Sequence, residues 1–182
     1  MDSLFHFIFP LIVALAARIH LKHGLKWIVG LALATVLLDL DIFLVHRATF
    51  HNLFVVLLIP AILVLLAFKY ERRGTKYKTL SLVLLLFFFS HTILDMGTEA
   101  GVQLLYPFSD QVYSFQGMTV ANPFGPGELL SGEGIALLLY FAVLLLVLFV
   151  EDFISFFMKD KTVRKAFRDT VRKEEKKIKR EL

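Results

Sequence analysis

Five long apolar runs alternate with shorter polar segments along the 182 residues of the chain. Each run is long enough for a helix to cross a hydrocarbon layer about 30 Å thick. The runs cover residues 4–21, 27–45, 51–68, 79–97 and 134–158. The pattern predicts an all-α, polytopic membrane protein with about five transmembrane helices, and a hydrophobic content of 57% agrees with that class.

The spacer between the fourth and fifth runs differs from the other spacers. Residues 98–132 contain three of the five prolines and no Lys or Arg. A connection of this length is usually a functional loop or a disordered one, and its apolar content argues against disorder. We expect a long external loop, with Tyr106 and Phe108 at the headgroup level, where aromatic rings are favoured.

The end of the chain is strongly basic. Residues 159–182 have eleven Lys or Arg against five acids, and Val163, Phe167 and Val171 recur at a helical spacing. This pattern fits a basic amphipathic helix on the cytoplasmic leaflet or, equally well, a solvated basic tail. The sequence therefore divides into a five-span membrane domain, residues 1–158, and a basic cytoplasmic tail, residues 159–182.

The positive charges predict the orientation of the spans. The formal net charge is +4, and 19 of the 20 Lys and Arg lie in residues 18–26, 69–78 and 159–180, after the first, third and fifth runs. Because positive segments stay in the cytoplasm, we expect an uncleaved first span in the cell membrane, with the N-terminus outside and the C-terminus in the cytoplasm. Membrane lipids are the expected partners, and topology explains the charge without a nucleic acid. The absence of cysteine excludes disulfides, thiolate metal sites and a cysteine nucleophile.

Two polar clusters, residues 38–52 and 91–95, interrupt the apolar pattern. An ionised group in lipid costs several kcal/mol unless it is paired or bound to a metal. The alternation of spans puts both clusters at the outer ends of their helices, so we expect them to meet and to hold a divalent metal ion. The candidate ligands are Asp39, Asp41, His46, His51, His91 and Asp95, with His6 as a weaker candidate.

The spacing within each cluster limits how its residues can bind an ion. On a helix, His91 and Asp95 are about 40° apart and can approach one ion from the same face. Asp39 and Asp41 are about 200° apart, so either the helix unwinds there or one aspartate ligates while the other orients a histidine. Imidazole and carboxylate ligands together make zinc the first candidate, with manganese, iron or nickel as alternatives.

The same residues allow two interpretations without a metal. Interhelical hydrogen bonds or ion pairs, such as Arg47 with Asp39 or Asp41, would serve only to hold the bundle together. A proton or ion pathway would also use intramembrane carboxylates and histidines. The polar residues gather at one end of the spans and leave the inner halves apolar, which disfavours a pathway.

The polar clusters resemble the motifs of the YdjM-like family, bacterial and archaeal membrane-bound proteins classed as metal-dependent hydrolases. The resemblance covers roughly residues 4–115 and includes His6 as the match to an early histidine of the family. The matching motifs read Asp39-Leu40-Asp41, then His46-Arg47-Ala48-Thr49-Phe50-His51, then His91 through Asp95 with Thr98 and Gly101, then Leu104-Leu105-Tyr106-Pro107. The chain departs from the family pattern at Leu38, Ala48 and the segment Phe50-His51-Asn52.

The resemblance and the clusters together suggest a membrane-bound metal-dependent hydrolase. Its site would open at the outer membrane face and act on an ester or phosphoester, either a small or a lipid-linked substrate. Asp41 or another carboxylate would take the proton of a metal-activated water, and Arg47 would bind an anionic group of the substrate. The alternative is a non-catalytic integral membrane scaffold or a metal-handling protein that uses the same residues.

Overall fold

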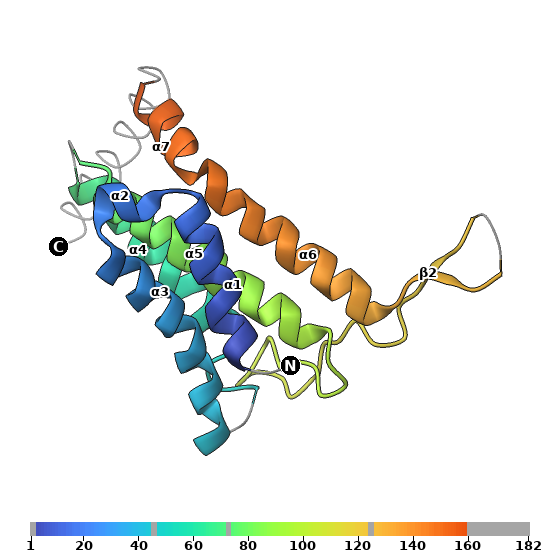
Figure 1. Ribbon diagram of the computed structural model, residues 1–182. Coiled ribbons are helices and arrows are strands. Elements are labelled where there is room, and N and C mark those ends of the chain that lie inside the picture. The colour runs from blue at the N-terminus through green and yellow to red at the C-terminus, as the bar shows by residue number, and fades with distance from the viewer. Residues whose placement is uncertain (1–2, 45–46, 72–73, 124–125, 160–182) are drawn as a thin grey trace.

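The chain is mostly helical over the residues that the structure describes (Figure 1). The computed structural model describes residues 3–44, 47–71, 74–123 and 126–159. The helices are α1 (Ser3–Ala16), α2 (Ile19–His23), α3 (Leu25–Leu37), the 3-10 helix η1 (Leu38–Phe43), the π-helix η2 (Phe54–Leu58), α4 (Ile59–Tyr70), α5 (Lys76–Met96), α6 (Gly132–Leu146), the 3-10 turn η3 (Val147–Phe149) and α7 (Val150–Lys159). The strands are β1 (Val120–Ala121) and β2 (Glu128–Leu130). The helical part of the predicted fold class is therefore confirmed.

Two of the described helices are long and apolar enough to cross a membrane. These are Lys76–Met96, which is α5, and Gly132–Met158, which joins α6 to α7 through η3. Shorter apolar helices cover Leu4–Ala16 and Phe54–Tyr70. Helices thus occur where the five apolar runs predict them, with ends that differ by a few residues.

The first apolar run is not the continuous helix that we expected over residues 4–21. Helix α1 ends at Ala16, and Arg18 adopts a left-handed conformation with φ 56°, which a right-handed helix cannot contain. The chain then makes the short helix α2 and turns again at Gly24, where φ is 90°. Fourteen residues of α1 rise only about 21 Å at ~1.5 Å per residue.

Helix α5 lies at the centre of the bundle, packed against α3, α4 and α6 (Figure 1). Two of its interior hydroxyl groups are satisfied within the helix. The hydroxyls of Ser90 and Thr92 donate hydrogen bonds to the carbonyl oxygens of Phe87 and Phe88, at 2.9 and 3.2 Å. Such back-bonding lets hydroxyl residues lie in an apolar interior without an unmet donor.

Helices α5 and α6 come very close together at Gly97, the residue that caps the C-terminus of α5. A Cβ atom built on Gly97 would lie 2.4 Å from the Cβ of Ala136 in α6. No side chain larger than hydrogen fits there unless the two helices separate. The glycine therefore sets the distance between them beside the polar end of α5.

The positive turns and α7 meet at one end of the bundle. Lys22 donates a hydrogen bond to the Glu151 carboxylate, and His23 Nε2 lies 3.3 Å from the other oxygen of that carboxylate. Lys76 lies over the ring of Trp27, 4.6 Å from its centroid. The predicted basic tail follows at this end of α7, but residues 160–182 lie outside the described part of the chain.

The long segment between α5 and α6 lies at the opposite end of the bundle, near the N-terminus (Figure 1). Strands β1 and β2 pair antiparallel and form a small hairpin in this segment. Closer to α5, Val102 and Tyr113 form an antiparallel bridge, and the Phe115 N–H donates to the Met96 carbonyl at 2.8 Å. The predicted loop is thus partly folded and fixed to the end of α5.

We predict that Gly97→Ala destabilises the protein, because the added methyl group must push α6 away from α5. An overpacked contact of this kind costs about 1–3 kcal/mol. The matched control is Gly30→Ala in α3, where an added Cβ meets nothing within 4 Å and the helix should gain about 0.5–1 kcal/mol. Apparent melting temperatures in detergent should fall for the first variant and stay level or rise for the second. Equal melting temperatures would contradict the close contact.

Candidate metal centre

His91 and Asp95 contribute two buried side chains to the polar cluster, from one face of α5 near its C-terminal end. Both side chains are almost completely buried, and His91 Nε2 lies 3.2 Å from Asp95 Oδ2. Their spacing of four residues places the two groups one above the other, as the sequence predicts. Thr98 continues the chain beyond them, and its hydroxyl donates to the Asp95 backbone carbonyl at 2.8 Å.

His51 reaches the same point from the turn before η2. Its Nε2 atom lies 2.9 Å from Asp95 Oδ2 and 3.0 Å from His91 Nε2, and the residue is 0% exposed. Asn52 fixes this turn. Its side-chain oxygen accepts the N–H groups of Phe54 and Val55, at 3.0 and 3.1 Å, as a cap at the start of the helical segment.

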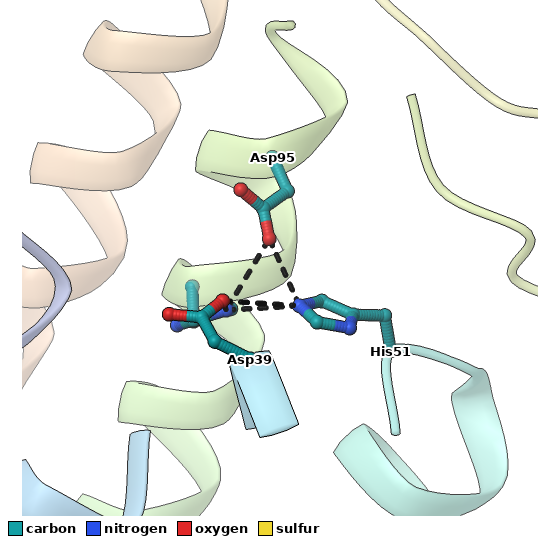
Figure 2. Close-up of side chains that lie close together, drawn as sticks. Asp39, His51 and Asp95 are labelled. Atoms are coloured by element: carbon teal, nitrogen blue, oxygen red, sulfur yellow. Dashed lines mark hydrogen bonds and ion pairs between the residues drawn. The ribbon is translucent and has the colours of Figure 1, made fainter. Parts of the chain in front are cut away.

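Asp39 completes the group from the end of the second helical segment. There α3 tightens into the 3-10 helix η1, so the chain neither continues as a regular helix nor unwinds. Asp39 Oδ1 lies 3.3 Å from His91 Nε2 and 3.8 Å from His51 Nε2. Figure 2 shows the carboxylates of Asp39 and Asp95 and the ring of His51 pointing toward one another.

These four residues offer a suitable donor set for one divalent cation. Their ligand atoms all lie within 4.8 Å of one another. Two ligands of one tetrahedral ion at bond lengths of about 2.0–2.2 Å lie about 3.3–3.6 Å apart. The five pairs that include a histidine, from 2.9 to 3.8 Å, lie around that separation. Two imidazole nitrogens and two carboxylate oxygens are all lone-pair donors, so a cation at their centre would satisfy all of them.

His6 lies beside this group rather than in it. The residue is 1% exposed, its ring centroid is 3.8 Å from that of His91, and its Nε2 is 3.5 Å from Asp95 Oδ1. Helix α3 holds it in place, because the Thr35 hydroxyl donates to the His6 carbonyl at 2.6 Å. His6 thus contacts the outer oxygen of Asp95, while Asp95 Oδ2 faces the two other histidines.

Arg47 approaches the same oxygen of the Asp95 carboxylate that His6 contacts. Its φ of 56° is left-handed, its Nη1 donates a hydrogen bond to the Thr98 hydroxyl, and its Nη2 lies 4.0 Å from Asp95 Oδ1. The described contacts join Arg47 to Asp95 and Thr98, whereas the predicted pair with Asp41 falls on a side chain outside the described part of the chain. Its side chain remains 17% exposed, so it can reach an incoming anion.

Two predicted ligands cannot be placed in this geometry. The side chain of Asp41 and the whole of His46 lie outside the described part of the chain. Two supporting residues, Asn52 and Thr98, were not predicted to have these roles. An asparagine directly before an apolar run is a helix-start signal and could have indicated the cap. The contact of Thr98 with Arg47 joins residues 51 positions apart and has no comparable local signal.

Comparison with known proteins gives one result. The model of the family described as YdjM inner membrane protein matches residues 1–154, a span that contains the whole polar cluster. No curated protein and no solved structure matches the chain. Because the match extends over most of the sequence, the chain belongs to the YdjM inner membrane protein family.

Proposed function

We propose that this inner membrane protein is a metal-dependent hydrolase that cleaves an ester or phosphoester bond. The observation that carries the proposal is the convergence of His51, His91, Asp39 and Asp95 on one point, with Arg47 beside it. Zinc is the first candidate for the metal, because imidazole and carboxylate ligands suit it. Manganese, iron and nickel are the alternatives.

The different burial of the four residues suggests different roles. The side chains of His51, His91 and Asp95 are at most 3% exposed, whereas that of Asp39 is 24% exposed. Three protein ligands with one open position are typical of catalytic zinc sites, and four are typical of structural ones. We therefore assign metal binding to the three buried residues. Asp39 would lie beside the open coordination position, which a water molecule would take.

The reaction follows from these roles. A divalent ion bound here would act as a Lewis acid and lower the pKa of water toward neutrality. Asp39 accepts the proton of the attacking water, a role that Asp41 could share, and Arg47 binds the anionic part of the substrate. The water oxygen bonds to the carbonyl carbon or phosphorus, the bond to the leaving oxygen breaks, and the proton passes to that oxygen.

A metal-handling or scaffold protein is the second candidate. It is favoured if Asp39 ligates together with the three buried residues, because four protein ligands then fill a tetrahedral sphere and leave no place for water. The Asp39 oxygen lies 3.3 Å from His91 Nε2, near enough for that arrangement. The coordination number of the loaded protein separates the two candidates.

For the membrane arrangement we propose five spans, with the N-terminus outside and the C-terminus in the cytoplasm. The support is the distribution of charge: Arg47 is the single Lys or Arg between residues 27 and 68, and the others lie in the basic turns and the tail. The polar cluster lies at the end of the bundle away from those turns. It would then open at the outer face, in contact with membrane lipids.

The first prediction from this proposal concerns metal content. His91→Ala removes a buried ligand, so purified protein should lose most of the roughly one equivalent of metal that the native protein binds. His20→Ala, a histidine in α2 at the other end of the bundle, should retain it. Elemental analysis after purification without added chelator makes the comparison. Unchanged metal in the His91 variant would exclude this centre.

The second prediction separates a substrate-binding Arg47 from a purely structural one. Arg47→Gln should leave metal content and melting temperature nearly unchanged and lower turnover about 100-fold, because the anionic substrate loses a charged donor. Arg18→Gln is the control, since Arg18 has the same φ of 56° and lies far from the centre. A large fall in melting temperature with Arg47→Gln would support the ion-pair interpretation instead. Screening esters and phosphoesters with each divalent metal provides the assay.

The third prediction concerns orientation. The native chain has no cysteine, so single cysteines can be labelled without background. A membrane-impermeant thiol reagent should label Ser109→Cys from outside the cell, and Thr75→Cys, in the basic turn directly before α5, only after the membrane is opened. The reverse pattern would overturn the proposed outward-facing site.

A further inference from the structure

Among the described residues of the candidate centre, some are buried and others are partly exposed. His51, His91 and Asp95 are sealed inside the bundle, and the partly exposed groups are the Asp39 carboxylate and the Arg47 guanidinium, at 24% and 17%. We therefore place the opening of the centre at these two groups, where a substrate would approach. The residues around this opening decide which molecules can enter.

The long loop after α5 borders the opening. The Gln103 N–H donates to the Arg47 carbonyl at 3.1 Å, and the Leu53 N–H donates to the Leu104 carbonyl at 2.9 Å. These bonds hold the loop against the turn that carries Arg47 and His51. The residues that follow them in the loop are therefore held close to this turn.

That part of the loop exposes large apolar side chains. Leu105 is 40% exposed and Phe108 is 81% exposed, and the Phe108 ring lies 5.5 Å from the ring of Phe54. Leu40, which follows Asp39 directly, and Leu44, at the end of the second helical segment, are 46% and 62% exposed. We call Leu40, Leu44, Leu105 and Phe108 the apolar rim.

An apolar rim beside a polar opening indicates contact with lipid. Exposed leucines on a spanning helix need no special explanation, but Leu105 and Phe108 lie in a loop outside the helices. Each buried CH₂ gains about 0.8 kcal/mol on leaving water, so these side chains favour the acyl region of a bilayer over the aqueous phase. The rim thus connects the opening to hydrocarbon.

The charge at the opening selects the headgroup. Arg47 is the single Lys or Arg among residues 27–68, and residues 98–132 contain none, so it is the one Lys or Arg side chain of these two segments. Guanidinium binds phosphate or carboxylate oxygens through two parallel hydrogen bonds. A ligand that places an anionic group at Arg47 and a hydrocarbon chain against the rim is an amphiphilic molecule.

We propose that the ligand of the candidate centre is a lipid with an anionic headgroup, which enters from the bilayer across the apolar rim with its headgroup on Arg47. Lipid binding is independent of the proposed hydrolase function. Only the later step, cleavage of an ester or phosphoester bond in that lipid, rests on it. Binding itself requires no turnover. A small water-soluble anion would use Arg47 but would have no use for the rim.

The test measures lipid contact at the rim by tryptophan fluorescence. The chain has one tryptophan, Trp27 at the basic end, so Trp27→Phe gives a dark background. Phe108→Trp then reports on the rim, and Leu138→Trp on the exposed face of α6 is the control, with Leu138 56% exposed. The zinc-loaded protein is placed in phosphatidylcholine vesicles that contain either brominated phosphatidylglycerol or brominated phosphatidylcholine at the same low fraction.

We expect brominated phosphatidylglycerol to quench the tryptophan at position 108 at least about twofold more than brominated phosphatidylcholine, because the anionic lipid concentrates near Arg47. Arg47→Gln should remove this difference, and the tryptophan at position 138 should show none. Equal quenching by both lipids at position 108, or a preference that persists in Arg47→Gln, would overturn the proposal. Absence of quenching by either lipid would show that the rim lies in water and would also overturn it.

A turnover measurement keeps this inference separate from the proposed function. If soluble short-chain esters or phosphoesters are hydrolysed while the anionic preference is missing, the hydrolase stands and the lipid ligand fails. If the preference is present while no ester, phosphoester or lipid is hydrolysed with any divalent metal, lipid binding stands and the hydrolase fails. Phe108→Ser should lower turnover of vesicle lipid about 10-fold, whereas Leu138→Ser on the exposed face of α6 should leave it within about twofold.

Discussion

The structure depends on the cost of placing ionisable groups inside an apolar bundle. Each uncompensated charge in such a place costs several kcal/mol, so His91 and Asp95 in α5 must find partners from other helices. They find them in His51 and Asp39, at 2.9 to 3.3 Å. The same contacts that meet this cost bring three chain segments to one point. The need to pair these buried groups therefore also determines the geometry of the candidate centre.

Sequence reasoning could predict the parts of the fold that local patterns determine. The apolar runs located the helices, because burial in lipid or protein demands such runs, and the i, i+4 spacing put His91 and Asp95 on one face. The break at Arg18 was missed, since hydropathy does not record a left-handed residue. The small hairpin of β1 and β2 was missed for a related reason: two short exposed strands have no strong alternation of apolar and polar residues.

The sequence indicates which residues meet at the candidate site better than it indicates how they are arranged there. Depth alone suggested that His51, Asp39 and the α5 pair meet, because alternating spans put them at the same end. It could not suggest that Arg47 faces Asp95 and Thr98, because that contact depends on how the loop after α5 folds back on the turn. Sequence reasoning ranked His6 as a weaker ligand candidate, but it could not show that this residue packs on His91 beside the four converging ligand atoms.

The order of the ligands along the chain has a consequence for biogenesis. Asp39, His51, His91 and Asp95 all precede the α5 cap at Gly97, whereas α6 begins at Gly132. Since a polypeptide is made and folded from its N-terminus, the four groups can come together before α6 has left the ribosome. The nascent chain would then already be able to capture a metal ion. The later arrival of α6 beside Gly97 would close the bundle around a centre that had formed before it.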